Sequence, residues 1–259
     1  MPEGDTVFQT ARQQNAALAG SVLTGCDIRV PKFATVDLSG ETVREVVARG
    51  KHLFHRIGDF SLHSHLKMEG AWHAYRPGER WRRPAFQARA VLTTATAQAV
   101  GFELGITEVL PTAEEDRVVG HLGPDLLGRD WDAAEAERRL AADPGAPVYV
   151  ALLEQRNLAG IGNVYANELC FLRGLLPTRP MGEVTDVAAL VALARRLLVA
   201  NVDRVARTTT GEDRPGRRTW VYGRGGRACL RCGTRLESGD LGARVGEERH
   251  VVWCPHCQR

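Results

Sequence analysis

The chain has 259 residues, a formal net charge of +3, 44% hydrophobic residues and 25% charged residues. These values are typical of a soluble globular protein and leave room for one large or two ordinary domains. No apolar run approaches the roughly 18 residues of a membrane span. The N-terminus has acids in place of a basic and an apolar region, so we expect no secretory signal and a cytoplasmic protein without disulfides.

The chain begins Met1-Pro2-Glu3-Gly4 and continues into a predicted helix over 5–18. Removal of Met1 before Pro2 leaves a secondary amine whose pKa, roughly 7.7–8.0 for an α-amino group, keeps part of it neutral at neutral pH. Beside it, Glu3 supplies an acid, and the pair suits imine chemistry on a sugar or carbonyl carbon. The ordinary alternative is a cytosolic chain that begins Met-Pro and places an acid in its first helical turn.

Short β-like runs separated by Gly, Pro, Asp or Ser follow this helix. They predict a two-layered antiparallel sheet or sandwich and a first domain over 1–112. Residues 76–84 read as an exposed connection. The predicted strands are 21–30, 42–48, 53–57, 60–65, 71–75 and 88–93.

The pattern becomes helical beyond Pro111, which gives an α+β chain overall. We expect an interdomain junction at 113–132, a helical domain at 133–218 and a separate C-terminal module at 219–259. Within the helical domain, residues 208–218 form a polar loop that we expect to be mobile. The predicted helices are 133–140, 148–155, 162–171 and 184–207.

Two C-x2-C pairs lie near the C-terminus, Cys229 with Cys232 and Cys254 with Cys257. Each pair can place two thiolates on one ion from a tight turn, and four sulfurs satisfy the tetrahedral preference of zinc. We therefore predict a structural zinc site without an open position for catalysis.

The C-terminal part of the chain is basic, with 12 Arg against 7 Asp and Glu from residue 201 onward. The preceding 200 residues are close to neutral. A basic end on a near-neutral body indicates a polyanionic partner.

Two further motifs have both a functional and a structural interpretation. The glycine-rich stretch 158–168 offers a helix N-terminus to a phosphate, with Asn163 as cap and donor, or is an ordinary helix–helix turn. Residues 63–70 offer donors for phosphate and Met68 as a flexible apolar wedge, or form a hairpin with a core Met.

Together these motifs resemble the formamidopyrimidine-DNA glycosylase / endonuclease VIII family. The matching segments keep the family's order over nearly the whole chain: MPEG at 1–4, RGKHL at 49–53, SHLKMEG at 64–70, LAGIGNVYANE at 158–168, VYGRGG at 221–226, and the cysteine pairs. The resemblance implies a β-sandwich domain, a helix-two-turns-helix domain and a zinc finger, with DNA in the cleft between domains.

The resemblance also implies a role for each matching residue. Pro2 would be the nucleophile and Glu3 the acid-base residue, and Lys51 a second catalytic cation. Arg249 would act with them and contact phosphate. His65 and Asn163 would contact phosphate, and Met68 would fill the space left by a flipped base. The implied protein is a monomeric DNA glycosylase and AP lyase of base excision repair that acts on damaged duplex or single-stranded DNA by β,δ-elimination.

Residues 101–108 lack the Arg-Arg-Phe-Gly-type turn of the formamidopyrimidine branch, and the loop before Trp220 is short. Both features favour the endonuclease VIII branch and oxidised pyrimidines over 8-oxoguanine. The chain has Asp5-Thr6 where the family has Pro followed by an acid, which favours lyase over glycosylase activity. The other hypotheses are an 8-oxoguanine/formamidopyrimidine glycosylase, a glycosylase for single-stranded lesions, and a zinc-module nucleic-acid-binding protein without catalysis.

Overall fold

A computed structural model describes residues 2–259, which divide into two compact units, 1–121 and 122–259. The boundary between the units falls inside the segment 113–132. The second unit contains the helices that follow residue 132 together with the cysteine-rich segment. Removal of Met1, on which the predicted nucleophile depends, concerns a residue outside the described ones.

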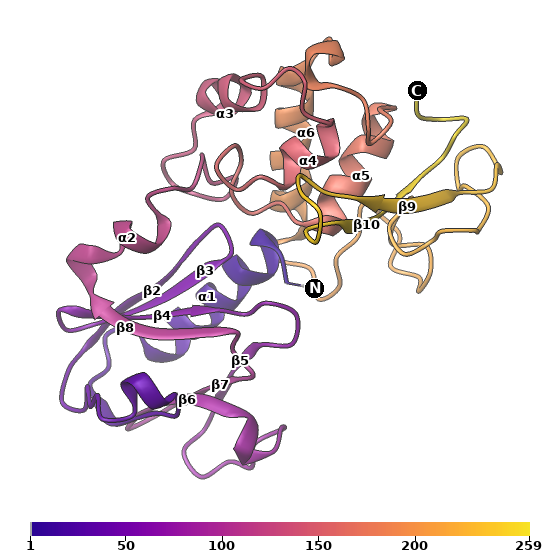
Figure 1. Ribbon diagram of the computed structural model, residues 1–259. Coiled ribbons are helices and arrows are strands. Elements are labelled where there is room, and N and C mark those ends of the chain that lie inside the picture. Colours follow the sequence, from indigo (N-terminus) through magenta and orange to yellow (C-terminus); the bar gives the residue numbers. More distant parts are fainter. Residues whose placement is uncertain (1) are drawn as a thin grey trace. The chain divides into compact units, whose positions relative to one another are not determined.

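The first unit is an antiparallel β-sandwich with one long helix, α1 (Gly4–Leu18) (Figure 1). One sheet has the strand order β1-β6-β7-β5 and the other the order β2-β3-β4-β8. The strands are β1 (Leu23–Ile28), β2 (Val43–Arg49), β3 (His52–Ile57), β4 (Phe60–His65), β5 (Ala71–Tyr75), β6 (Ala88–Thr94), β7 (Gln98–Phe102) and β8 (Ile106–Pro111).

The core of this unit lies between the two sheets and under α1. Alternate residues of β3, Leu53 and Ile57, are fully buried there, as are Leu62 of β4 and Leu92 of β6. The helix α1 packs against β2 and β5, the edge strands of the two sheets, and buries Val7 and Leu18. The helix thus covers one edge of each sheet and protects backbone groups there that would otherwise be open to pairing. The short helices η1 (Pro31–Phe33), η2 (Ala85–Gln87), η3 (Thr112–Glu114) and α2 (Asp116–Val119) complete the unit.

The second unit packs four helices around a core of aliphatic residues and the buried Tyr149 and Tyr165. Its elements are α3 (Ala133–Leu140), α4 (Val148–Leu153), α5 (Asn163–Arg173), η4 (Met181–Glu183), α6 (Val187–Asn201), β9 (Glu237–Leu241) and β10 (Arg249–Trp253). The strands β9 and β10 form a two-stranded antiparallel sheet that packs against α5.

The predicted α+β class and all six predicted strands are confirmed, whereas β7 and β8 were not predicted. The sixth helix ends at Asn201 and not at residue 207, because the Asn201 side chain turns back. Its Nδ2 donates to the Leu197 and Thr208 carbonyls, and its Oδ1 accepts from the Thr208 amide.

The loop 208–218 is crossed by hydrogen bonds, including one from the Thr209 amide to the Arg218 carbonyl at 2.8 Å. Its predicted mobility stays a prediction. None of the helices formed by the described residues is long and apolar enough to cross a membrane.

Candidate functional site

Pro2 and Glu3 lie at the start of α1. Glu3 is the N-cap residue with φ −125°, and its backbone carbonyl accepts from the Val7 amide at 3.0 Å. The Glu3 side chain does not cap the helix and is fully buried, whereas Pro2 is half-buried. The partial positive charge of a helix N-terminus disfavours protonation of an amine placed there. A buried carboxyl group therefore lies beside the residue whose nitrogen would become an amine on removal of Met1.

Asp5, in the first turn of the helix, forms a hydrogen bond with the helix backbone. Its Oδ1 accepts from the Thr6 amide at 2.8 Å, and the residue is 3% exposed. This carboxylate is therefore engaged with the helix N-terminus.

Lys51 and His65 lie near the same end of the sheet β2-β3-β4-β8. Lys51 follows Gly50 in the tight β2–β3 turn, where Gly50 has φ 57°, and His52 pairs with His65 across β3 and β4. Burial lowers the pKa of His65 to about 4, and the charges of Lys67 and Lys51 add to this effect. His65 is thus neutral at neutral pH.

The proton on His65 has a defined position. Its Nδ1 accepts from the Lys67 amide at 2.9 Å, so the proton of the neutral ring is on Nε2. His65 therefore offers an N–H donor in a locally cationic environment, which suits an oxygen of a phosphate.

Met68 is displayed by the turn 66–70, which we call the Met68 turn. Lys67 has φ 52°, and the Gly70 amide closes the turn on the Leu66 carbonyl at 2.9 Å. A Cβ at Gly70 would lie 2.4 Å from the Leu66 carbonyl oxygen, so only glycine fits. Met68 is 60% exposed, which contradicts the alternative of a core Met.

Asn163 was predicted to cap α5, and this prediction is wrong in its position: Gly162 is the N-cap and Asn163 is the first helical residue. The amide is instead tied to neighbouring groups. Its Oδ1 accepts from the Tyr149 hydroxyl at 2.5 Å and from Asn167 Nδ2 at 2.7 Å, and its Nδ2 donates to the His250 carbonyl at 3.1 Å. This last bond places Asn163 beside β10, whose first residue is the exposed Arg249.

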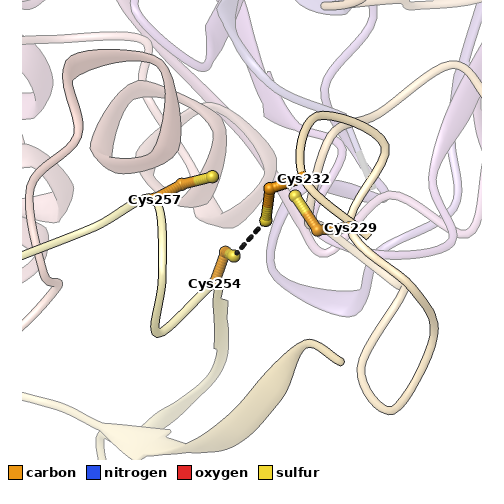
Figure 2. Close-up of side chains that lie close together, drawn as sticks. All are labelled: Cys229, Cys232, Cys254 and Cys257. Carbon is orange, nitrogen blue, oxygen red and sulfur yellow. Dashed lines mark hydrogen bonds between the residues drawn. The ribbon is translucent and has the colours of Figure 1, made fainter. Parts of the chain in front are cut away.

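The four predicted metal ligands converge (Figure 2). The Sγ atoms of Cys229, Cys232, Cys254 and Cys257 all lie within 4.8 Å of one another, and those of Cys232 and Cys254 are 3.5 Å apart. A zinc ion with Zn–S bonds of about 2.3 Å requires sulfurs about 3.8 Å apart, so the cluster fits zinc with small adjustments. The structure contains no metal ion.

The protonation of the cluster also favours a cation. A hydrogen bond from Thr234 lowers the pKa of Cys232 to about 6, while burial and the neighbouring Cys232 raise the pKa of Cys257 to about 12. The Cys232 thiolate forms readily, whereas Cys254, whose pKa is also raised by burial, and Cys257 resist adding negative charge until a cation compensates it.

The cluster also ties together distant parts of the second unit. Arg231, between Cys229 and Cys232, stacks over Phe171 of α5 with its guanidinium carbon 4.3 Å from the ring centroid. Phe171 in turn stacks on Trp220.

Comparisons with family models identify two known domains in this chain. Two family models match, the formamidopyrimidine-DNA glycosylase N-terminal domain over residues 1–103 and the formamidopyrimidine-DNA glycosylase H2TH domain over residues 122–212.

The chain belongs to the formamidopyrimidine-DNA glycosylase family.

Full-length relatives in the family are similar in sequence. The "Probable endonuclease 8 2" of Streptomyces coelicolor is 55% identical, over 100% of this chain and 94% of the relative. The "DNA-(apurinic or apyrimidinic site) lyase Nei2" of Mycolicibacterium smegmatis is 54% identical, over 100% and 99%. The "Endonuclease 8 2" of Mycobacterium tuberculosis is 51% identical over 100% of both chains. These names confirm the predicted endonuclease VIII branch.

The crystal structure of a complex between Lactococcus lactis Fpg and abasic-site DNA has a TM-score of 0.81 with this chain. It shares 23% sequence identity and covers 99% of both chains, which confirms the predicted fold.

A buried carboxylate, Glu168 of α5, was not anticipated from the sequence. It accepts hydrogen bonds from the backbone amides of Trp220, Val221 and Tyr222 at 2.7 to 2.9 Å and from the Thr209 hydroxyl. Glu168 thereby anchors the start of the VYGRGG segment of this family member. In the sequence, the only indication of a role for Glu168 was its position at the end of the LAGIGNVYANE motif.

A histidine chain on β3, β4 and β8 was also not anticipated. His63 Nδ1 lies 2.7 Å from Glu108 Oε1, and His63 Nε2 lies 2.9 Å from His52 Nδ1. With Glu108 ionised, His63 donates to Glu108 and accepts from His52, so both tautomers are fixed. The three groups rigidify the end of the sheet that carries Lys51 and His65.

Proposed function

We propose that this protein is a bifunctional DNA glycosylase and AP lyase of base excision repair, with Pro2 as its nucleophile. The observation that carries the proposal is identity of 51–55% over the full chain to proteins named as endonuclease 8 or AP lyase. The buried acid Glu3 beside Pro2 at the start of α1 supports it.

The chemistry follows from a neutral secondary amine beside an acid. The Pro2 nitrogen attacks the sugar C1′ of a flipped nucleotide while the bond from C1′ to the base breaks and the departing base receives a proton. The attacking nitrogen loses its proton, the bond from C1′ to O4′ breaks with protonation of O4′, and the opened sugar is left as an iminium that acidifies the C2′ proton. Its removal expels the 3′ phosphate, a second elimination expels the 5′ phosphate, and hydrolysis releases Pro2.

The remaining site residues have binding roles in this proposal. Lys51 supplies a cation near the reacting sugar, and His65, Asn163 and Arg249 contact backbone phosphates. Met68 enters the stack where the base has left. The protein acts as a cytoplasmic monomer, and the four cysteines hold a structural zinc ion that shapes the segment carrying Arg249.

Oxidised pyrimidines are the favoured lesions. The turn between β7 and β8, Glu103 to Gly105, has neither of the arginine and phenylalanine fillers that the formamidopyrimidine branch uses. Lyase activity is expected to exceed glycosylase activity, because the Asp5 carboxylate is occupied by the Thr6 amide.

The test uses end-labelled DNA, duplex and single-stranded, with an abasic site, an oxidised pyrimidine or 8-oxoguanine. We expect the fastest cleavage at the abasic site, products that carry phosphate at both new ends, and faster release of the pyrimidine than of 8-oxoguanine. Binding without cleavage of any substrate would instead support a nucleic-acid-binding protein without catalysis. Faster release of 8-oxoguanine would assign the chain to the other substrate class.

A further inference from the structure

Charge in the first unit is strongly segregated. Residues 1–121 contain 14 basic and 14 acidic residues, so the unit has no net charge. The segment 76–89, which we call the basic loop, contains five arginines and one acid, Glu79. The rest of the unit is therefore acidic, and the loop is a local cationic surface.

The basic loop alternates between anchored and exposed residues. Trp81 is half-buried, and its Nε1 donates to Gln98 Oε1 at 2.7 Å while its ring packs edge-on against Phe102. Arg80 and Arg82, on either side, are exposed. The one acid of the loop, Glu79, is engaged in a backbone hydrogen bond: its Oε2 accepts from the Arg76 amide at 3.0 Å.

Arg83 fixes this loop beside the Met68 turn. Its Nη1 donates to the Glu69 carbonyl at 3.0 Å and to Glu103 Oε2, in the turn between β7 and β8, at 2.9 Å. The β7–β8 turn also packs on the Met68 turn, since a Cβ at Gly105 would lie 2.2 Å from Lys67 Cγ. Three segments of the first unit thus meet next to the exposed Met68.

The exposed side chains of the loop have the chemistry of a nucleic-acid surface. Guanidinium groups bind phosphate through paired N–H donors, and an aromatic face accepts a base by stacking. Phe86 is 78% exposed, and Arg89 Nη1 donates to its carbonyl at 3.0 Å. Residues 79–85 line an open hollow of about 610 Å³.

We propose that Arg80 and Arg82 bind two backbone phosphates of DNA beside the Met68 turn, which makes the basic loop a second DNA-contact surface of the first unit. The proposal rests on the proposed function, because that function places DNA at Met68.

The test measures the salt dependence of binding to a duplex with a central tetrahydrofuran abasic analogue. Each phosphate contact contributes about 0.9 to the slope of log K against log salt concentration. For the double variant Arg80→Ala/Arg82→Ala we expect a slope shallower by about 1.8. The factor by which the affinity falls between 50 and 200 mM salt should then be about 10-fold smaller for this variant than for wild type. The variant Arg80→Lys/Arg82→Lys keeps both charges and should keep most of the slope.

The matched control is Arg44→Ala/Arg117→Ala, which removes two charges of the same unit. These side chains are 60% and 77% exposed and each pairs with an exposed or half-exposed acid. The control should keep the wild-type slope. An unchanged slope in Arg80→Ala/Arg82→Ala, or an equal loss in the control, would overturn the proposal.

Borohydride trapping of wild-type protein on abasic-site DNA runs in parallel. If wild type is trapped and the slope of Arg80→Ala/Arg82→Ala is unchanged, the basic loop is excluded and the proposed function stands. If wild type is not trapped but the slope falls, the loop binds DNA and the proposed chemistry is wrong.

Discussion

Two groups at the start of α1 carry the proposed chemistry, and their environments differ. Glu3 is fully buried, while Pro2 is half-buried at the positive end of the helix. Burial of an acid beside a neutral amine is the arrangement required to protonate a leaving base while the amine attacks.

Replacement of Glu3 by Gln tests this division of labour. We expect Glu3→Gln to slow release of an oxidised pyrimidine by about 100-fold or more, the usual contribution of a positioned general acid. Trapping at a preformed abasic site should fall less, since no base has to leave. Single-turnover rates on the two substrates provide the comparison, with exposed Glu41→Gln as control. Equal losses on both substrates would contradict the assignment of Glu3 to base release.

His55 makes the free energy of unfolding depend on pH. It is fully buried in β3 against Trp72, and neither ring nitrogen has a hydrogen-bond partner among the described residues. Burial lowers its pKa to about 3, against about 6.5 in an unfolded chain. Above pH 6.5 both states are neutral. Below it, only the unfolded state takes up the proton, so stability is lost as the pH falls.

The prediction concerns His55→Leu. Between pH 6 and pH 4, the free energy of unfolding of wild type should fall by about 1.4 kcal/mol per pH unit more than that of the variant. Urea unfolding at several pH values measures this difference. The slopes should coincide between pH 7.5 and 8.5, which serves as the internal control. Parallel curves down to pH 4 would show that His55 is protonated in the folded state.

Secondary-structure elements were predictable where local pattern decides them. The helices predicted over 133–140 and 148–155 are observed over 133–140 and 148–153, and the first six strands follow from punctuation by turn residues. The strand β8 was missed because its residues are nearly all half-buried, so it shows no clear alternation. The end of α6 was missed because the Asn201 side chain, through tertiary hydrogen bonds to Thr208, sets it.

The cluster of four cysteines is the part of the proposed site that the sequence identified most completely, because two C-x2-C pairs leave few other arrangements. The contacts that attach this cluster to the rest of the second unit could not be predicted from the sequence. The stacking of Arg231 on Phe171 and the hold of Glu168 on Trp220 depend on residues far apart in the sequence.

Cys254→Ser tests the module as a unit. We expect the variant to lose bound zinc and to bind abasic-analogue DNA at least 10-fold more weakly, because β10 joins Cys254 to Arg249. Elemental analysis and binding titrations measure the two losses, and Cys26→Ser in the first unit is the matched control. Loss of zinc with unchanged affinity would separate the metal from DNA binding.

At the scale of the whole molecule, the family could be identified from the sequence because short motifs keep their order over the full chain. The hydrogen-bond partners of individual side chains could not be predicted from these motifs. Asn163 was expected as a helix cap, yet its amide is bonded to Tyr149, Asn167 and His250. The histidine chain to Glu108 joins three strands, and no local spacing reveals it.

The central claim is that Pro2 forms an iminium with the sugar of damaged DNA. The most direct measurement is borohydride trapping on abasic-site DNA by protein whose N-terminus has been verified by mass, followed by mapping of the adduct. We predict a covalent adduct on Pro2 and at least a 10-fold slower rate of adduct formation in Pro2→Gly with zinc retained. Absence of an adduct when Pro2 is the verified N-terminus, or an adduct on a lysine at the wild-type rate, would contradict the claim.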